Sequence, residues 1–209
     1  SFVNFAGALL TRRSRNFELR LASSIGAVSG NGRLTLAAAN ASGRAAAAGV
    51  SAAAIEGLKQ PLRGVVDSQL RMPVEAKLLQ QSGAVLIATC VQDESRFTPL
   101  IKAGAQVWVG PANEQGHVDL AALLAELGRR QCHQVLVEAG AHLSGSFLAE
   151  SLVDQLTIFM APKLLGSKAR PLFELPFEQM SQAYGLKIES MTSVGVDWRI
   201  EASPKGPDN

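Results

Sequence analysis

The sequence has few charged residues and no long hydrophobic run, and each shortage excludes a class of protein. Charged side chains make up 18% of the 209 residues, below the soluble-protein average of about 25%, which argues against a disordered or strongly charged binding protein. The net charge is only +2, so no large basic field indicates nucleic acid binding. Since no run of about 18 apolar residues occurs, no membrane span is predicted. The hydrophobic content of 47% suffices for the core of one domain, or of two small ones.

Cysteine is also scarce, and the two that occur, Cys90 and Cys132, do not form a metal-binding pattern. There is no C-x-x-C motif, and the three histidines are not spaced as ligands. The Cys132–His133 pair is better explained as the junction between a helix and a strand. We therefore predict no metal site, and two cysteines outside any disulfide or metal pattern fit the reducing cytoplasm.

A secretion signal is missing as well. Residues 1–10 are apolar, but no basic region precedes them, and the arginines at 12, 13 and 15 follow instead. This order is the reverse of a signal peptide, which agrees with a cytoplasmic location.

Strand and helix patterns alternate along the chain and predict an α/β fold. Period-two alternation predicts a half-buried strand at 17–23, and Asp119 is a suitable N-cap for a helix over 120–127 that Gly128 and the arginines after it should end. Alternating strands on either side of residues 193–195 predict an antiparallel hairpin. We expect a mixed, mainly parallel sheet flanked by helices, with this hairpin at the C-terminus. Further strands are predicted at 63–68, 84–89, 105–109, 134–137 and 155–160, and a short helix at 143–151.

Polar residues stand at the ends of three predicted strands, at 67–68, at Thr89 and at 138–140. Ligands of open α/β sheets bind beyond the carboxyl ends of the strands. We therefore expect these residues on one rim.

The segment from Gly140 to Ser146 consists largely of small residues between a strand and a helix. Small side chains let a pyrophosphate approach the backbone, and the start of a helix favours negative charge. The spacing is not G-x-G-x-x-G, so an ordinary strand–turn–helix connection is the alternative. Ser144 and Ser146 would donate to phosphate or cap the helix, and His142 would contact a ligand or be solvated.

Glu138 is the strongest single candidate for a substrate contact. A carboxylate at the end of an apolar strand has to be exposed in a cleft or paired. It could accept hydrogen bonds from a pyrimidine N–H or amino group, or form a salt bridge. Ser68 would contact a cofactor or end a strand, and Lys163 would meet a phosphate or lie on the surface.

Four segments together resemble one family. Val66-Asp-Ser-Gln69, Val137-Glu-Ala-Gly140, Leu152-Val-Asp-Gln-Leu156 and Ala161-Pro-Lys-Leu-Leu-Gly-Ser-Lys-Ala-Arg170 resemble, in order, signatures of the C-terminal reductase domain of the bacterial riboflavin-biosynthesis deaminase/reductase. The resemblance covers about residues 58–202. It implies a dihydrofolate-reductase-like fold, a homodimer, and reduction of 5-amino-6-(5-phosphoribosylamino)uracil by NADPH.

The resemblance also assigns residues. In the family, the serine that matches Ser68 contacts NADPH, and the glutamate that matches Glu138 contacts the substrate, which makes Glu138 the candidate catalytic group as well. The loop that wraps the cofactor matches Gly140, Ala141, His142, Leu143, Ser144, Gly145 and Ser146. We expect a connecting segment at 1–16, the reductase domain at 17–203 and a tail at 204–209.

The N-terminal quarter departs from the family pattern. Residues 37–54 contain alanine at 11 of 18 positions, and no phosphate-binding arginine motif is recognisable there. The H-x-E and P-C-x-x-C motifs of the family's zinc deaminase domain are absent, so the resemblance implies either a reductase alone or a piece of the bifunctional enzyme. Two alternatives remain open: a reductase of dihydrofolate or another pteridine, and a catalytically inactive module that binds nucleotide or dimerises.

Overall fold

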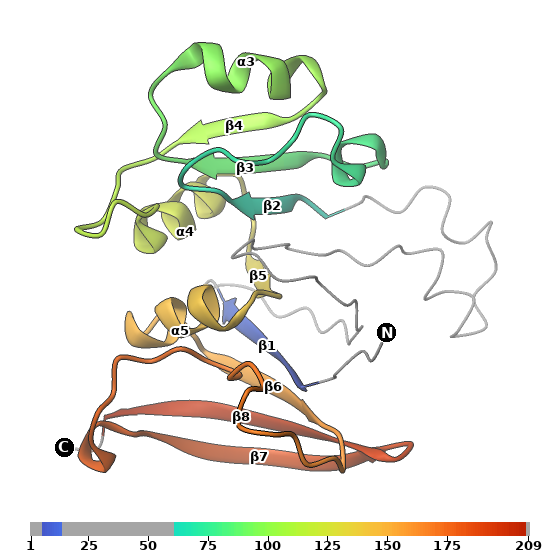
Figure 1. The fold of residues 1–209 in the computed structure, drawn as a ribbon, viewed down its shortest axis with the longest axis vertical. Helices are drawn as coiled ribbons and strands as arrows, with labels where there is room; N and C mark the ends of the chain where they lie inside the picture. Colours follow the sequence, from blue (N-terminus) through green and yellow to red (C-terminus); the bar gives the residue numbers. More distant parts are fainter. Residues whose placement is uncertain (1–5, 14–60, 208–209) are drawn as a thin grey trace. The chain divides into compact units, whose positions relative to one another are not determined.

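The computed structural model describes residues 6–13 and 61–207, with side chains described for 61–205. Within these ranges the chain forms two compact units. One contains residues 61–132, and the other contains the strand β1 (Ala6–Arg13) together with residues 133–207. Figure 1 shows the elements of both.

The unit of residues 61–132 is built on a parallel sheet. Its strands are β2 (Arg63–Val66), β3 (Val85–Thr89) and β4 (Gln106–Val109), in the order β2-β3-β4. Every residue of β2 and β3 is buried, as expected for parallel strands that are covered on both faces. A short 3-10 helix, η1 (Lys77–Gln80), and the helix α3 (Glu94–Lys102) lie in the connections, and α4 (Leu120–Arg129) follows β4.

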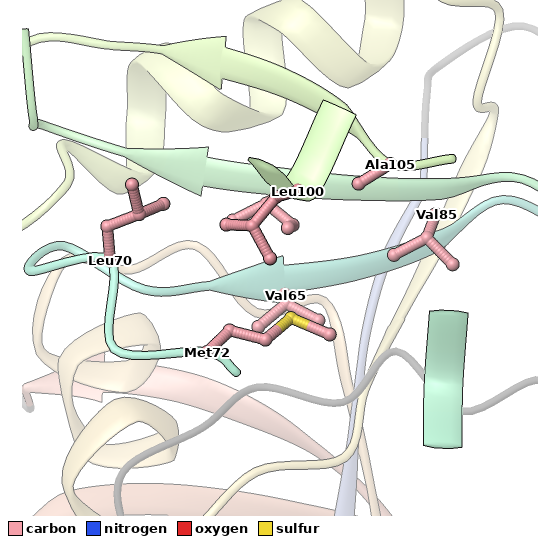
Figure 2. Close-up of a cluster of buried hydrophobic side chains, with 7 residues drawn as sticks. Val65, Leu70, Met72, Val85, Leu100 and Ala105 are labelled. Atoms are coloured by element: carbon pink, nitrogen blue, oxygen red, sulfur yellow. The ribbon is translucent and has the colours of Figure 1, made fainter. Parts of the chain in front are cut away.

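A cluster of buried side chains forms the core of this unit (Figure 2). Ile87 at the centre of β3 is fully buried, and Leu100 places the apolar side of α3 against the sheet. Burial of one such side chain stabilises the fold by about 1.5–3 kcal/mol. The members of the cluster are Val65, Leu70, Met72, Val85, Ile87, Leu100 and Ala105.

Side chains cap both helices of this unit. The Asp93 carboxylate accepts from the Ser95 N–H at 3.0 Å at the start of α3, and Asp119 accepts from the Ala122 N–H at 2.8 Å at the start of α4. The predicted cap of α4 is thus confirmed, although the helix includes Gly128 and ends at Arg129. The sequence did not indicate α3, which contains Pro99, a residue that usually argues against a helix interior.

The other unit is built on an antiparallel sheet of five strands. Their order is β5-β1-β6-β8-β7, with β5 at Gln134–Val137, β6 at Gln155–Met160, β7 at Tyr184–Val194 and β8 at Asp197–Pro207. The helix α5 (Ala141–Ala149) joins β5 to β6 and buries Phe147 and Leu148. A 3-10 turn, η2 (Met180–Gln182), precedes β7.

The predicted C-terminal hairpin is confirmed by the antiparallel pairing of β7 with β8. Gly195 has φ +64° and is the first of the two residues between the strands. This is the position at which a tight hairpin turn of type II′ requires glycine.

The structure confirms the α/β class with a parallel sheet, helices and a hairpin, and it adds one arrangement that the sequence did not predict. The parallel strands are β2, β3 and β4, whereas β5 and β6 both pair antiparallel with β1. Within the expected connecting segment 1–16, residues 6–13 form β1, the strand between β5 and β6. Short apolar runs predict strands but not the direction of their partners. The predicted strand at 17–23 and the alanine-rich 37–54 lie outside the described residues.

No helix in the described ranges has both the length and the apolar character needed to cross a membrane.

Candidate functional site

The ends of β2 and β3 meet at one edge of the parallel sheet, as predicted. The Asp67 N–H donates to the Ala88 carbonyl at 2.9 Å, and the Thr89 hydroxyl donates to the Ser68 carbonyl at 3.3 Å. The buried Asp67 carboxylate accepts from the Met72 N–H at 2.7 Å. Asp67 thus shapes the turn after β2.

Ser68 lies half-buried at this edge. Its hydroxyl oxygen accepts from the Val118 N–H at 3.0 Å, a contact 50 residues apart in the sequence. A serine hydroxyl that accepts one hydrogen bond still has its own proton to donate. The side chain is therefore held in place with a donor that a ligand can use.

Cys90 follows Thr89 at the same edge. Burial raises the pKa of its thiol, and its Sγ faces the Pro111 carbonyl oxygen at 3.8 Å. A raised pKa lowers the fraction of thiolate at neutral pH, which makes Cys90 a weaker nucleophile than an ordinary thiol.

Glu138 follows β5 directly and is only 8% exposed. Burial of a carboxylate is costly unless polar groups compensate for the lost water. Glu138 is separated from the first residue of α5 by Ala139 and Gly140 alone. The buried acid and the start of the helix are thus adjacent along the chain.

The start of α5 is open. Gly140 is the N-cap residue, and no side chain caps the helix. A Cβ built at Gly140 would meet nothing within 4 Å, and the residue is exposed. The first backbone N–H groups of a helix and its dipole attract anions, so this helix start fits the pyrophosphate of a dinucleotide cofactor.

The two serines of this segment bond to backbone carbonyls. Ser144 is almost fully buried and donates to the Ala139 carbonyl at 3.3 Å, which ties the helix to the turn before it. Ser146 donates to the His142 carbonyl at 3.1 Å. His142 is exposed and Leu143 is half-buried.

Gly145 contacts another part of the chain. A Cβ at this position would overlap the Glu174 carbonyl oxygen, and the Glu174 N–H donates to the Ala141 carbonyl at 3.0 Å. The absence of a side chain at Gly145 therefore lets the backbone at Glu174 pack on α5. No sequence pattern predicts this contact, because Glu174 belongs to no recognisable motif.

The structure places the predicted site residues in two groups. Glu138 and residues 140–146 are contiguous in the unit that contains α5, and Ser68 belongs to the unit of residues 61–132. Across the described ranges, no group of three or more histidine, cysteine or acidic residues is arranged to hold a metal ion.

A known protein family matches most of the chain. The model of the RibD C-terminal domain matches residues 23–200. Riboflavin biosynthesis protein RibD of Escherichia coli K12 is 36% identical over 143 residues, which are 68% of this chain but only 38% of that protein. A 5-amino-6-(5-phosphoribosylamino)uracil reductase of Buchnera aphidicola is 30% identical, with 70% of this chain and 69% of that protein covered.

Solved structures of similar fold agree with this match. RibD of Acinetobacter baumannii has a TM-score of 0.58 and 28% identity, with 72% of this chain and 40% of that chain covered. A deaminase/reductase from Thermotoga maritima, at 15% identity and a TM-score of 0.55, shows the same fold. The chain thus spans about two-fifths of the length of the RibD proteins it matches.

Proposed function

The chain belongs to the family of RibD C-terminal domains, and on this basis we propose that it reduces 5-amino-6-(5-phosphoribosylamino)uracil to the ribitylamino product, with NADPH as the reductant. The observation that carries the proposal is the arrangement at 138–146, where a buried acid stands directly before an uncapped, open helix start. A similar protein of Buchnera, of which this chain covers about two-thirds, bears the name of this reductase.

The cofactor would lie at the start of α5. The N–H groups of the first turn of α5 would bind the pyrophosphate of the cofactor. The absence of a side chain at Gly140 leaves room for this group. Ser144 would hold the turn in shape through its bond to Ala139. Ser68 stays a cofactor contact that the family resemblance implies. When bound, the cofactor supplies a hydride to C1′ of the ribosyl group.

Glu138 would accept hydrogen bonds from the pyrimidine and orient the ribosyl group. Orientation of two reactants can account for several kcal/mol of a lowered barrier, and the cofactor itself provides the redox chemistry. As the ribosyl ring opens, its oxygen takes up a proton, for which Glu138, solvent or the substrate itself is the donor.

The test is NADPH oxidation by the purified chain with the phosphoribosylamino-pyrimidine and, separately, with dihydrofolate. We expect oxidation with the pyrimidine alone. Oxidation only with dihydrofolate would make the chain a pteridine reductase, and NADPH binding without turnover of either compound would make it an inactive nucleotide-binding module.

We also propose that the chain forms a homodimer through an apolar sheet face. Paired residues of adjacent antiparallel strands point to the same side, and the register therefore gathers apolar residues of β6, β7 and β8 on one face. Ile188 is 61% exposed and Met191 49% exposed there. The same register places on this face Ile158, Met160, Leu186, Trp198 and Ile200, together with the buried Leu156 and Ala202.

The greater length of the RibD relatives supports a further proposal, that a deaminase domain accompanies this chain in a longer protein.

A further inference from the structure

The segment 161–170, which we call the strap, joins the end of β6 to the chain that returns toward α5. Residues 162–170 are exposed without exception, including Leu164, whose side chain has no cover at all, and Leu165, which is 51% exposed. Two adjacent leucines outside the core contribute little to stability. Their exposure in a segment between two packed elements suggests that they are covered in another state of the protein.

The strap has a strong positive charge. Lys163, Lys168 and Arg170 are its only charged residues, and no acidic residue occurs in the sequence between Asp154 and Glu174. In the part of the chain that the structure describes, none of these three side chains forms a hydrogen bond or an ion pair with protein. The three cations are thus available to an anion.

The chain just beyond the strap is fixed to α5. The Glu174 N–H donates to the Ala141 carbonyl at 3.0 Å, and the Glu174 backbone packs against Gly145. Arg170 is four residues before Glu174, so their Cα atoms are at most about 14 Å apart even if the chain is fully extended. Figure 1 shows this segment running from β6 back to α5 before β7 begins.

Two backbone bonds give the strap its shape. The Lys163 N–H donates to the Ala161 carbonyl at 2.8 Å, and the Ala169 N–H donates to the Gly166 carbonyl at 2.9 Å. The backbone at Lys163 and at Lys168 therefore forms turns and is not fully extended.

We infer that the strap binds a phosphate ester of the ligand held at the start of α5 and closes over it. This inference rests on the proposed function. Charge-assisted hydrogen bonds from lysine and arginine to phosphate are about twice as strong as neutral ones, and closure would cover Leu164 and Leu165 and exclude water from the reacting groups. The phosphate belongs to the cofactor or to the substrate, and both offer the same chemistry.

The test removes the three charges together. The variant Lys163→Gln/Lys168→Gln/Arg170→Gln is compared with Lys205→Gln, which removes an exposed cation elsewhere in the same unit. NADPH affinity is measured by titration, and KM is measured for the phosphoribosylamino-pyrimidine and for its dephosphorylated form, each at low and high salt.

We expect the triple variant to bind one phosphate ligand at least tenfold more weakly, with a smaller dependence on salt and an unchanged unfolding temperature. Loss of NADPH affinity assigns the strap to the cofactor. A raised KM for the phosphorylated pyrimidine, with no change for the dephosphorylated form, assigns it to the substrate. Parent-like NADPH affinity together with parent-like KM values would overturn the inference.

Closure of the strap over the ligand can be measured separately, by protection from trypsin. Trypsin should cut the parent chain after Lys163 and Lys168, and saturating NADPH or pyrimidine should slow both cuts. Cleavage at the same rate with either ligand bound would contradict closure. If the parent binds NADPH but reduces no pyrimidine, the proposed function fails, while the NADPH titration and the protection experiment still decide the inference.

Discussion

Gly145 was predicted to belong to a cofactor loop, but the structure shows a different need for glycine at this position. The sequence groups it with a cofactor loop, whereas the structure places its Cα against the backbone at Glu174. Spacing along a chain reveals small residues but not what packs against them. The role of Gly145 in the cofactor site stays a prediction.

Gly145→Ala should destabilise the protein by about 1–3 kcal/mol, because the new methyl group would overlap backbone that has to move. The matched substitution Gly128→Ala, in α4 where a Cβ would meet nothing within 4 Å, should instead stabilise by about 0.5 kcal/mol through helix propensity. Denaturant unfolding of both variants measures this contrast. A neutral Gly145→Ala would contradict the close packing of Glu174 on α5.

Cys90 should react slowly at neutral pH. Because burial raises the pKa of its thiol, the thiolate fraction at a given pH is smaller than that of a free thiol. In the Cys132→Ser variant, iodoacetamide should alkylate Cys90 more slowly than N-acetylcysteine at pH 7.5, and the rate should rise as the pH increases beyond the ordinary thiol pKa. Faster alkylation of Cys90 than of the small thiol would contradict this.

At the scale of elements, the sequence predicted β5, β6 and α4 well because each has a clear signal. An apolar run bounded by polar residues marks both strands, and Asp119 marks the start of the helix. The sequence did not predict α3, because Pro99 conceals the helical pattern. It also did not predict where β1 lies in the sheet. Strand order and direction depend on contacts between distant residues, which no local pattern reports.

A buried carboxylate on α4 stabilises this element. Glu126 is 5% exposed and is paired with Arg129 and Arg130, each at 2.6 Å, while Arg130 also donates to Gln106 on β4 at 2.6 Å. Glu126→Gln should lower the free energy of unfolding by about 1–2 kcal/mol, since charge-assisted bonds are lost but the arginines can still be hydrated. The exposed Glu114→Gln is the control, with an expected change below about 0.5 kcal/mol. Equal effects would show that the pairing contributes nothing.

At the scale of the whole molecule, the four family segments were predictive because they occur together and in order, and the match over residues 23–200 confirms the family. The same reasoning could not establish the site. The predicted rim is confirmed for Asp67, Ser68 and Thr89, whereas the contacts of Glu138 and of residues 140–146 with a ligand remain proposals. Those contacts depend on molecules that the sequence can only suggest.

The proposed homodimer leads to a prediction about assembly. Met191→Glu places a charge on the exposed apolar face and should weaken the dimer at least tenfold, because a buried charge at an interface needs a partner. Thr192→Glu, on the opposite face of the same strand by register, should leave it intact. Sedimentation velocity over a concentration series measures both, and a parent chain that stays monomeric would contradict the proposal.

The central claim is that this chain transfers a hydride to the pyrimidine substrate, and it is tested most directly by NADPH that carries deuterium on the transferred position of its nicotinamide. Mass spectrometry of the ribitylamino-pyrimidine should show one deuterium per molecule with the parent chain, and far less product with Glu138→Gln than with the exposed control Glu178→Gln. Oxidation of NADPH without deuterium in any pyrimidine product would contradict the assignment of this chain as the reductase.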